Sequence, residues 1–173
     1  MPERVIPIDA LPRNRNVHRV ILHWTAGGPK PSALDKAHYH FLVDQQGMLY
    51  RGAAGPGIYL PHTRQLNTGS VGLSLCGMAG ATSLRSLGAY PLTKVQIERA
   101  CQAAADIIAA YDLALSGRTC LTHAEVTTVY GIEQRGKWDI TVLPPWPEIQ
   151  PEHCGTYLRD KVQWYLQRFH GRR

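Results

Sequence analysis

The chain has 173 residues, of which 44% are hydrophobic and 18% are charged, and this composition excludes a disordered or fibrous protein. The length fits one domain over residues 1–173 and is sufficient to bury a sizeable core. The net charge of +6 favours polyanionic partners. Because the sequence has no recognised nucleic-acid-binding motif and no aromatic–basic platform, we expect no nucleic-acid partner.

Apolar, β-branched runs predict three strands in the first third of the chain. The segment 17–24 (VHRVILHW) predicts a buried strand. Residues 39–43 and 48–51 predict a hairpin joined by a tight turn. Between the first two strands, Ser32 is a good N-cap for a short helix that ends near His38.

The middle of the chain predicts one more strand and the clearest helix. A long loop over residues 53–69 precedes an alternating segment, 70–76, which predicts a strand. A second loop covers residues 77–92. A capping box begins a helix at Thr93, and apolar residues at helical spacing continue it to about Leu113.

The last third predicts a short strand, an irregular region and a final helix. Residues 119–122 predict a strand that delivers His123, and four prolines indicate irregular structure over 124–153. Helical spacing of apolar residues predicts a helix over 156–169. This order of elements predicts an α/β fold with a central mixed β-sheet flanked by helices.

Three polar residues could form a metal site. His23 and His123 each follow an apolar strand-like run, and a strand end holds a ligand rigidly while leaving one side open to solvent. Together with Asp139 they provide two imidazoles and one carboxylate, a set typical of catalytic zinc sites with a fourth position for water. The cysteines contain no CxxC pair, so a cysteine zinc cage is not predicted. Spacing alone leaves the metal hypothesis open, because the sequence has no HExxH cluster.

An ordered set of segments resembles the type 2 N-acetylmuramoyl-L-alanine amidases. The segments are VILHWTAGG, HYHFLVDQQGMLYRG, a loop histidine, NTGSVGLSLCG, LTHAEV and GKWDI, and they lie roughly within residues 17–143. That family includes small phage endolysins and shares its fold with the peptidoglycan recognition proteins. The resemblance therefore implies this fold, one Zn²⁺ ion, and peptidoglycan or a muropeptide as substrate.

The resemblance places the zinc ligands on His23, His123 and Asp139. The gap from His123 to Asp139 is longer than in many family members. His153 and Cys154 therefore compete with Asp139 for the position of third ligand.

The resemblance also implies catalytic roles for two residues. Lys137 matches the catalytic lysine, whose cation can stabilise the oxyanion of a tetrahedral intermediate. Tyr39 matches a tyrosine that orients the attacking water or shares its proton. Some members carry a catalytic glutamate where this chain has Ser74, so the identity of the general base stays open.

Two residues of the long loop are predicted to bind substrate. His62 matches a family histidine near the substrate groove, where it could hydrogen-bond the substrate carbonyl or the muramyl group. Asn67 lines the groove or caps a turn. His38 and His40 flank Tyr39, and the alternation of side chains along a strand predicts that both point away from the face carrying Tyr39.

The resemblance implies hydrolysis of the amide bond between N-acetylmuramic acid and L-alanine, by a protein that serves as a phage endolysin. One alternative is a cytoplasmic amidase that recycles muropeptides, and another is a non-catalytic module that only binds peptidoglycan. We expect a monomer without a separate wall-binding domain.

Two further expectations concern where the chain acts. No run approaches the roughly 18–20 apolar residues of a membrane span, and residues 1–10 lack the apolar middle of a secretory signal. We therefore expect the protein to stay in the cytoplasm until its release and then to act on the wall. The final helix has a basic flank, which predicts weak contact with an anionic membrane. That flank consists of Arg159, Lys161, Arg168, Arg172 and Arg173.

Overall fold

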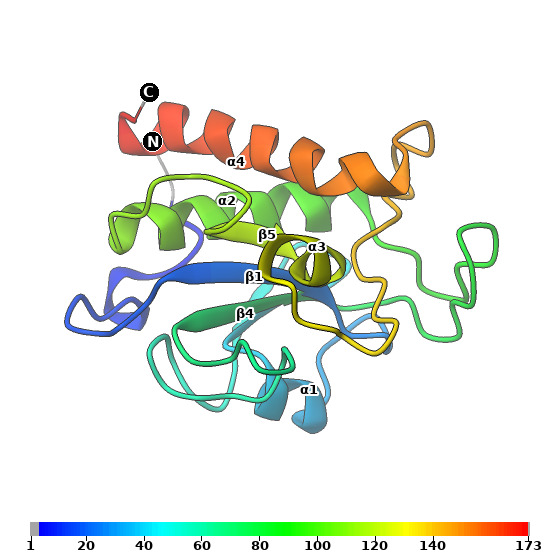
Figure 1. Cartoon of the computed structure of the whole chain (residues 1–173), viewed down its shortest axis with the longest axis horizontal. Helices are drawn as coiled ribbons and strands as arrows, with labels where there is room; N and C mark the ends of the chain where they lie inside the picture. The colour runs from blue at the N-terminus through cyan, green and yellow to red at the C-terminus, as the bar shows by residue number, and fades with distance from the viewer. Residues whose placement is uncertain (1–3, 173) are drawn as a thin grey trace.

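The computed structural model describes residues 4–172, which form a single sheet with helices on both faces (Figure 1). The strands are β1 (Arg19–Trp24), β2 (Phe41–Val43), β3 (Leu49–Arg51), β4 (Ser70–Leu75) and β5 (Cys120–Thr122). The α-helices are α1 (Ala33–His38), α2 (Lys94–Ala110), α3 (Val126–Tyr130) and α4 (Cys154–His170). Short 3-10 turns are η1 (Ile8–Ala10), η2 (His123–Glu125) and η3 (Pro151–His153).

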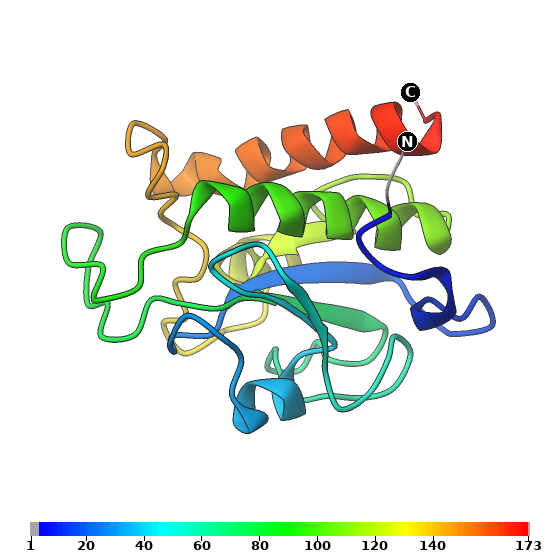
Figure 2. The same cartoon turned by 180° about the vertical axis from the view of Figure 1, so that it is seen from behind.

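The sheet has the strand order β3-β2-β4-β1-β5. Every neighbouring pair is parallel except β2 and β3, which form the antiparallel hairpin. Helices α2 and α4 lie on one side of the sheet and α1 lies on the other, as both views show (Figures 1 and 2). The predicted α/β fold with a mixed sheet is therefore confirmed.

The two faces of β1 have different neighbours. Val20, Leu22 and Trp24 belong to the large hydrophobic core, which includes the buried sides of α2 and α4. Ile21 instead packs in a small cluster with Leu121 of β5. Because side chains alternate along a strand, His23 shares the face of Ile21 and points away from α2. The sheet alternation thus decides on which side of the molecule this histidine lies.

The predicted helix in the middle of the chain is confirmed as α2, and its capping box is present. Thr93 accepts a hydrogen bond from the backbone N–H of Gln96, whose side chain accepts one from Thr93 N–H. Gln96 is fully buried and its amide donates to the carbonyls of Val43 and Cys76. One glutamine therefore joins the start of α2 to the ends of β2 and β4.

The structure differs from the sequence prediction at Tyr39. This residue was predicted to lie in a strand over 39–43, but it caps the C-terminus of α1, and its N–H donates to Asp35 O. Gly52 lies directly against the Tyr39 carbonyl, where a Cβ atom would approach within 1.8 Å. The helix end and this close approach leave only Phe41–Val43 for β2.

The region 124–153, predicted to be irregular, contains helix α3. This helix has five residues, too few to show a periodic apolar pattern, and it ends at Gly131 with φ +70°. The final helix begins at Cys154, two residues earlier than predicted. No helix within residues 4–172 is both long and apolar enough to cross a bilayer.

Helix α4 uses most of its basic residues for internal contacts. Arg159 forms a bidentate pair with Glu125 and also donates to Cys120 O, at 3.1 Å. Lys161 pairs with Glu98 of α2. Arg172, just after α4, donates to the carbonyls of Ile108 in α2 and of Leu113 beyond it. Arg173 lies outside the described residues. These contacts fasten α4 to β5 and α2, while contact with a membrane stays a prediction.

The central strands should carry most of the stability. Leu73 is completely buried in β4, so Leu73→Ala should lower the free energy of unfolding by about 2–5 kcal/mol. Leu34 is 69% exposed in α1, and Leu34→Ala should change it by less than about 0.5 kcal/mol. Urea unfolding of both variants measures the difference. Equal effects would contradict the assigned core.

Candidate active site

Strand register brings His23 and His123 together. Strands β1 and β5 are parallel, and Leu22 lies opposite Thr122. His23 follows Leu22 within β1, and His123 follows Thr122 as the first residue of η2, so both emerge at the same edge of the sheet. Both are buried, and their Nδ1 atoms lie 3.1 Å apart. Neither histidine could be moved to the other face without shifting its strand by one residue.

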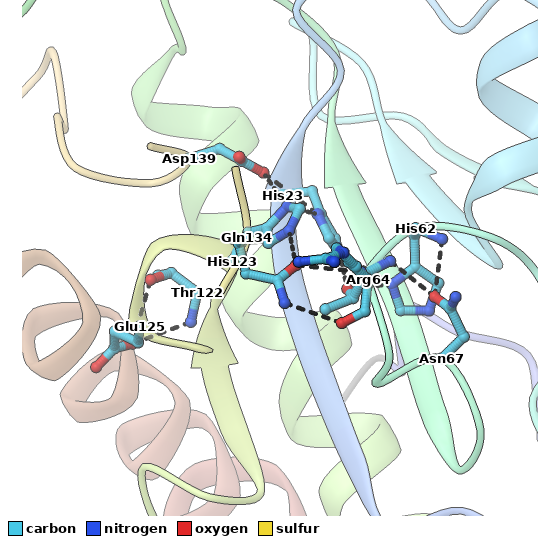
Figure 3. Close-up of polar contacts among 10 residues, drawn as sticks. His23, His62, Arg64, Asn67, Thr122, His123, Glu125, Gln134 and Asp139 are labelled. Carbon is cyan, nitrogen blue, oxygen red and sulfur yellow. Dashed lines mark hydrogen bonds and ion pairs between the residues drawn. The ribbon is translucent and has the colours of Figure 1, made fainter. Parts of the chain in front are cut away.

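Asp139 reaches this pair from a loop. Its backbone carbonyl accepts a hydrogen bond from the N–H of Ala124, next to His123. Trp138 packs edge-to-face on Trp24, with ring centres 4.7 Å apart. The Oδ2 atom of Asp139 is 3.2 Å from Nδ1 of His23 and 3.4 Å from Nδ1 of His123 (Figure 3). The long gap between His123 and Asp139 is taken up by η2, α3 and the loop that follows them.

The three donor atoms have the spacing of a tetrahedral metal site. Metal–nitrogen bonds of about 2.0–2.1 Å give tetrahedral edges of about 3.3–3.4 Å. The three observed separations are 3.1, 3.2 and 3.4 Å. Among the described residues, the group of side chains close enough to hold a metal is His23, His123 and Asp139. The competing candidates lie elsewhere, because Cys154 is in the core and His153 is exposed on η3.

Hydrogen bonds on the far sides of the imidazoles also fit a metal. Nε2 of His123 is 2.9 Å from Oε1 of Gln134, which can only accept, so Nε2 carries the proton and Nδ1 keeps its lone pair. Nε2 of His23 lies 3.1 Å from Nδ1 of His62 and 3.4 Å from Oγ1 of Thr63. When His62 Nδ1 or Thr63 Oγ1 accepts the proton on His23 Nε2, the Nδ1 atom of His23 keeps its lone pair. Lone pairs on both Nδ1 atoms and on the Asp139 carboxylate then face one point. A bound cation satisfies all three.

Burial sets the protonation states of the group. It lowers the pKa of His23 to about 4, although the contact with the Asp139 carboxylate acts in the opposite direction. Burial also lowers the pKa of His62 well below its ordinary value, and the neighbouring His23 adds to the effect. Burial alone would raise the pKa of Asp139, but its close contacts with His123 and His23 outweigh it and lower that pKa. At neutral pH the site therefore combines neutral His23 with an ionised carboxylate, the forms that bind metal.

A cleft of about 430 Å³ opens beside this group. Tyr39 and Lys137 line it together with His123 and Asp139. The Tyr39 ring lies 5.1 Å from the ring of His23, and burial together with the charge of Asp139 raises its pKa, so it remains a phenol. Lys137 is exposed at the rim. The structure thus brings both predicted catalytic residues to the cleft beside the predicted ligands.

The two predicted substrate-binding residues have different positions. His62 lines the cleft but is buried, and its ring lies against Gly72, where a Cβ atom would come within 2.9 Å. Its Nδ1 faces His23, as described above. Asn67 does not line the cleft, and its Oδ1 accepts from the N–H groups of His62 and Thr63. It therefore holds the loop in shape, while substrate contact stays a prediction for both residues.

The prediction that His38 points away from Tyr39 is wrong. Both residues line the cleft, and their rings are 6.4 Å apart. Strand alternation does not apply to His38 because it is the last residue of α1. His40 has a structural role, since its two ring nitrogens bond to Ile58 O and to the N–H of Gly72.

Sequence reasoning missed Gln134 and Thr63. Both contact ring nitrogens of the predicted ligand histidines, at 2.9 Å for Gln134 and 3.4 Å for Thr63. Each is a polar residue in a loop without periodicity, so only the folded arrangement identifies it. Ser74 lies beside His23 in the register of β1 and β4, and its side chain is buried.

The family model described as N-acetylmuramoyl-L-alanine amidase matches residues 13–141, and the chain belongs to this family. No curated protein matches the sequence. Membership of this family supports amidase activity on peptidoglycan.

Two solved amidase structures share the fold, and a peptidoglycan recognition protein is among the other matches. The amidase AmiD from E. coli, in complex with anhydro-N-acetylmuramic acid-L-Ala-D-gamma-Glu-L-Lys, is 18% identical with a TM-score of 0.58, covering 90% of this chain and 60% of its own. The amidase LysC from Clostridium intestinale URNW is 16% identical with a TM-score of 0.50, covering 72% and 79%. The Drosophila peptidoglycan recognition protein SA is 16% identical with a TM-score of 0.49, covering 65% and 70%.

Acid should destabilise the metal-free protein mainly between pH 6.5 and 4. In this range His23 takes up a proton in the unfolded chain but not in the folded one, because its pKa falls from 6.5 to about 4 on folding. Unfolding therefore binds protons, and stability falls as the pH falls, by at most about 3 kcal/mol from this residue. Urea unfolding in the presence of a chelator, at steps from pH 7 to pH 4, measures the loss. The variant His23→Asn should show a shallower dependence, and an equal slope would contradict the assignment.

Proposed function

We propose that the protein is a zinc-dependent N-acetylmuramoyl-L-alanine amidase, which hydrolyses the amide bond between the lactyl group of N-acetylmuramic acid and L-alanine. The observation that carries the proposal is the buried convergence of His23, His123 and Asp139 beside an open cleft. The family match supports the same chemistry. The ligand in the AmiD structure contains this type of linkage, which supports the choice of substrate.

The residues around the group have complementary roles. When bound, zinc would supply Lewis acidity and lower the pKa of a water molecule to about 7. His23, His123 and Asp139 would hold the ion. Lys137 places a positive charge at the rim of the cleft, where it can stabilise negative charge that develops on the substrate carbonyl oxygen. Tyr39 keeps its proton and can donate a hydrogen bond into the cleft.

Removal of the metal or its ligands should abolish cleavage. Purified sacculi incubated with the protein should release peptides with a free N-terminal L-alanine and leave the glycan strands intact, as measured by mass spectrometry. A chelator should stop the release and zinc should restore it. His23→Ala and His123→Ala should lose both zinc and activity, whereas His153→Ala, at the exposed competing position, should keep both.

Other outcomes of this experiment have clear meanings. Cleavage of glycosidic bonds, or cleavage that ignores the chelator, would contradict the proposal. Binding of sacculi without cleavage by the zinc-loaded protein would instead identify a recognition module.

Lys137 should act on the rate and not on metal content. Lys137→Met should lower kcat by about 10²–10³-fold, the usual effect of removing one group that stabilises an oxyanion. The zinc content should stay at the wild-type value. Lys30→Met, which removes an exposed lysine outside the cleft lining, is the matched control and should leave kcat unchanged. Loss of zinc from the Lys137 variant would show that the residue supports the metal group instead.

We also propose that the protein acts as an endolysin on the polymeric wall after release from the cytoplasm. The net charge of +6 supports this role because the wall is a polyanion. Initial rates on intact sacculi and on soluble muropeptides, each at low and high salt, test the proposal. We expect efficient, salt-sensitive cleavage of sacculi. Activity confined to soluble muropeptides would identify a recycling amidase.

A further inference from the structure

Gln134 joins His123 to the loop that lies behind His23. It is 4% exposed and comes from the loop after α3. Its Oε1 lies 2.9 Å from Nε2 of His123 and 3.1 Å from the N–H of Arg64. Its Nε2 donates to the carbonyl of Arg64, at 2.9 Å, and to the carbonyl of Ile132, at 3.4 Å. All four hydrogen-bonding positions of the amide are therefore occupied.

The backbone of Arg64 fixes the orientation of this amide. A peptide N–H only donates and a peptide carbonyl only accepts, so the Gln134 oxygen must face the Arg64 N–H and its NH₂ must face the Arg64 carbonyl. A reversed amide would oppose like groups at both contacts. The oxygen that faces Arg64 N–H also faces His123. Since that oxygen cannot donate, the proton of neutral His123 must lie on Nε2 (Figure 3).

The contact between Gln134 and the Arg64 backbone also supports His23. Arg64 directly follows Thr63 and His62, whose side chains lie against Nε2 of His23. Asn67 holds the N–H groups of these two residues from the other side of the turn. Arg64 is tied to the loop a second time, because its Nη1 donates to Glu133 O at 3.0 Å. The loops that support the two histidines are thus joined into one unit.

We propose that Gln134 is a positioning residue of the metal group: it fixes the His123 proton on Nε2, leaves Nδ1 free to bind the ion, and fastens the His62–Asn67 loop behind His23. This inference rests on the proposed function, and it adds a residue that acts through His123 without touching substrate. Partners of this kind typically change metal affinity by about 10–100-fold.

Two substitutions distinguish the effect of Gln134 on the His123 proton from its effect on the His62–Asn67 loop. Gln134→Leu removes every hydrogen bond of the amide, so zinc should bind about 10–100-fold more weakly. Gln134→Glu keeps an acceptor for His123 Nε2–H and for Arg64 N–H but loses both donors. Its zinc affinity should remain within about threefold of wild type, because a carboxylate partner also fixes the imidazole and raises its basicity. Competition with a chromophoric chelator measures the zinc affinity of each folded variant.

Gln96→Leu is the matched control. Gln96 is also a buried glutamine whose amide holds two carbonyls, but these belong to Val43 and Cys76 at the ends of β2 and β4. Gln96→Leu and Gln134→Leu should both lower the urea midpoint, whereas only Gln134→Leu should weaken zinc binding. Equal zinc affinity in Gln134→Leu and wild type, or equal weakening in Gln96→Leu, would overturn the inference.

The tautomer can be measured without any metal. Nitrogen-15 NMR of the metal-free wild-type protein at neutral pH should show His123 protonated on Nε2, and a proton on Nδ1 would overturn the inference even if Gln134→Leu does not fold. This readout also separates the two proposals. A wild-type protein that binds no zinc but shows the Nε2–H tautomer would remove the proposed function and leave the placement of the proton by Gln134 intact.

Discussion

The parallel register between β1 and β5 is the constraint on which the rest of the site depends. It aligns Leu22 with Thr122, so that His23 in β1 and His123, directly after β5, lie at the same sheet edge. A shift of either strand by one residue would turn its histidine toward α2 and the main core. Register is enforced from that core, because Val20 and Leu22 are buried there. The hydrophobic packing of one sheet face thus determines the geometry of polar groups on the other.

Much of this arrangement could be predicted from the sequence, for reasons that differ between elements. Strand β1 is predictable because a continuous apolar run indicates a buried strand. Helix α2 is predictable because its apolar residues recur at helical spacing, which indicates one buried face. The spatial grouping of His23, His123 and Asp139 was inferred from family resemblance, since residues so far apart in the chain carry no local signal of contact. Tyr39 was misplaced because an extended residue after a helix and the first residue of a strand have the same local pattern.

Other features depend on loop geometry and could not be predicted. Helix α3 is too short to generate a periodic pattern. Gln134 is a polar loop residue among other polar residues, and its partner Arg64 contributes only backbone atoms. Because every residue except proline offers the same backbone N–H and carbonyl, the residue type at position 64 does not indicate this contact. The support around the histidines is therefore the part of the site least visible in the sequence, although it determines which imidazole nitrogen faces the metal.

The contacts of Arg159 with Glu125 and with the carbonyl of Cys120 connect the last helix to β5, the strand directly before His123. Glu125 also accepts a hydrogen bond from the N–H of Thr122, directly before that histidine. During synthesis on the ribosome, β1 and β5 emerge well before Arg159 does. The histidine pair thus receives its final support only after Arg159 has left the exit tunnel, and a nascent or interrupted chain that lacks this residue carries an unfinished site.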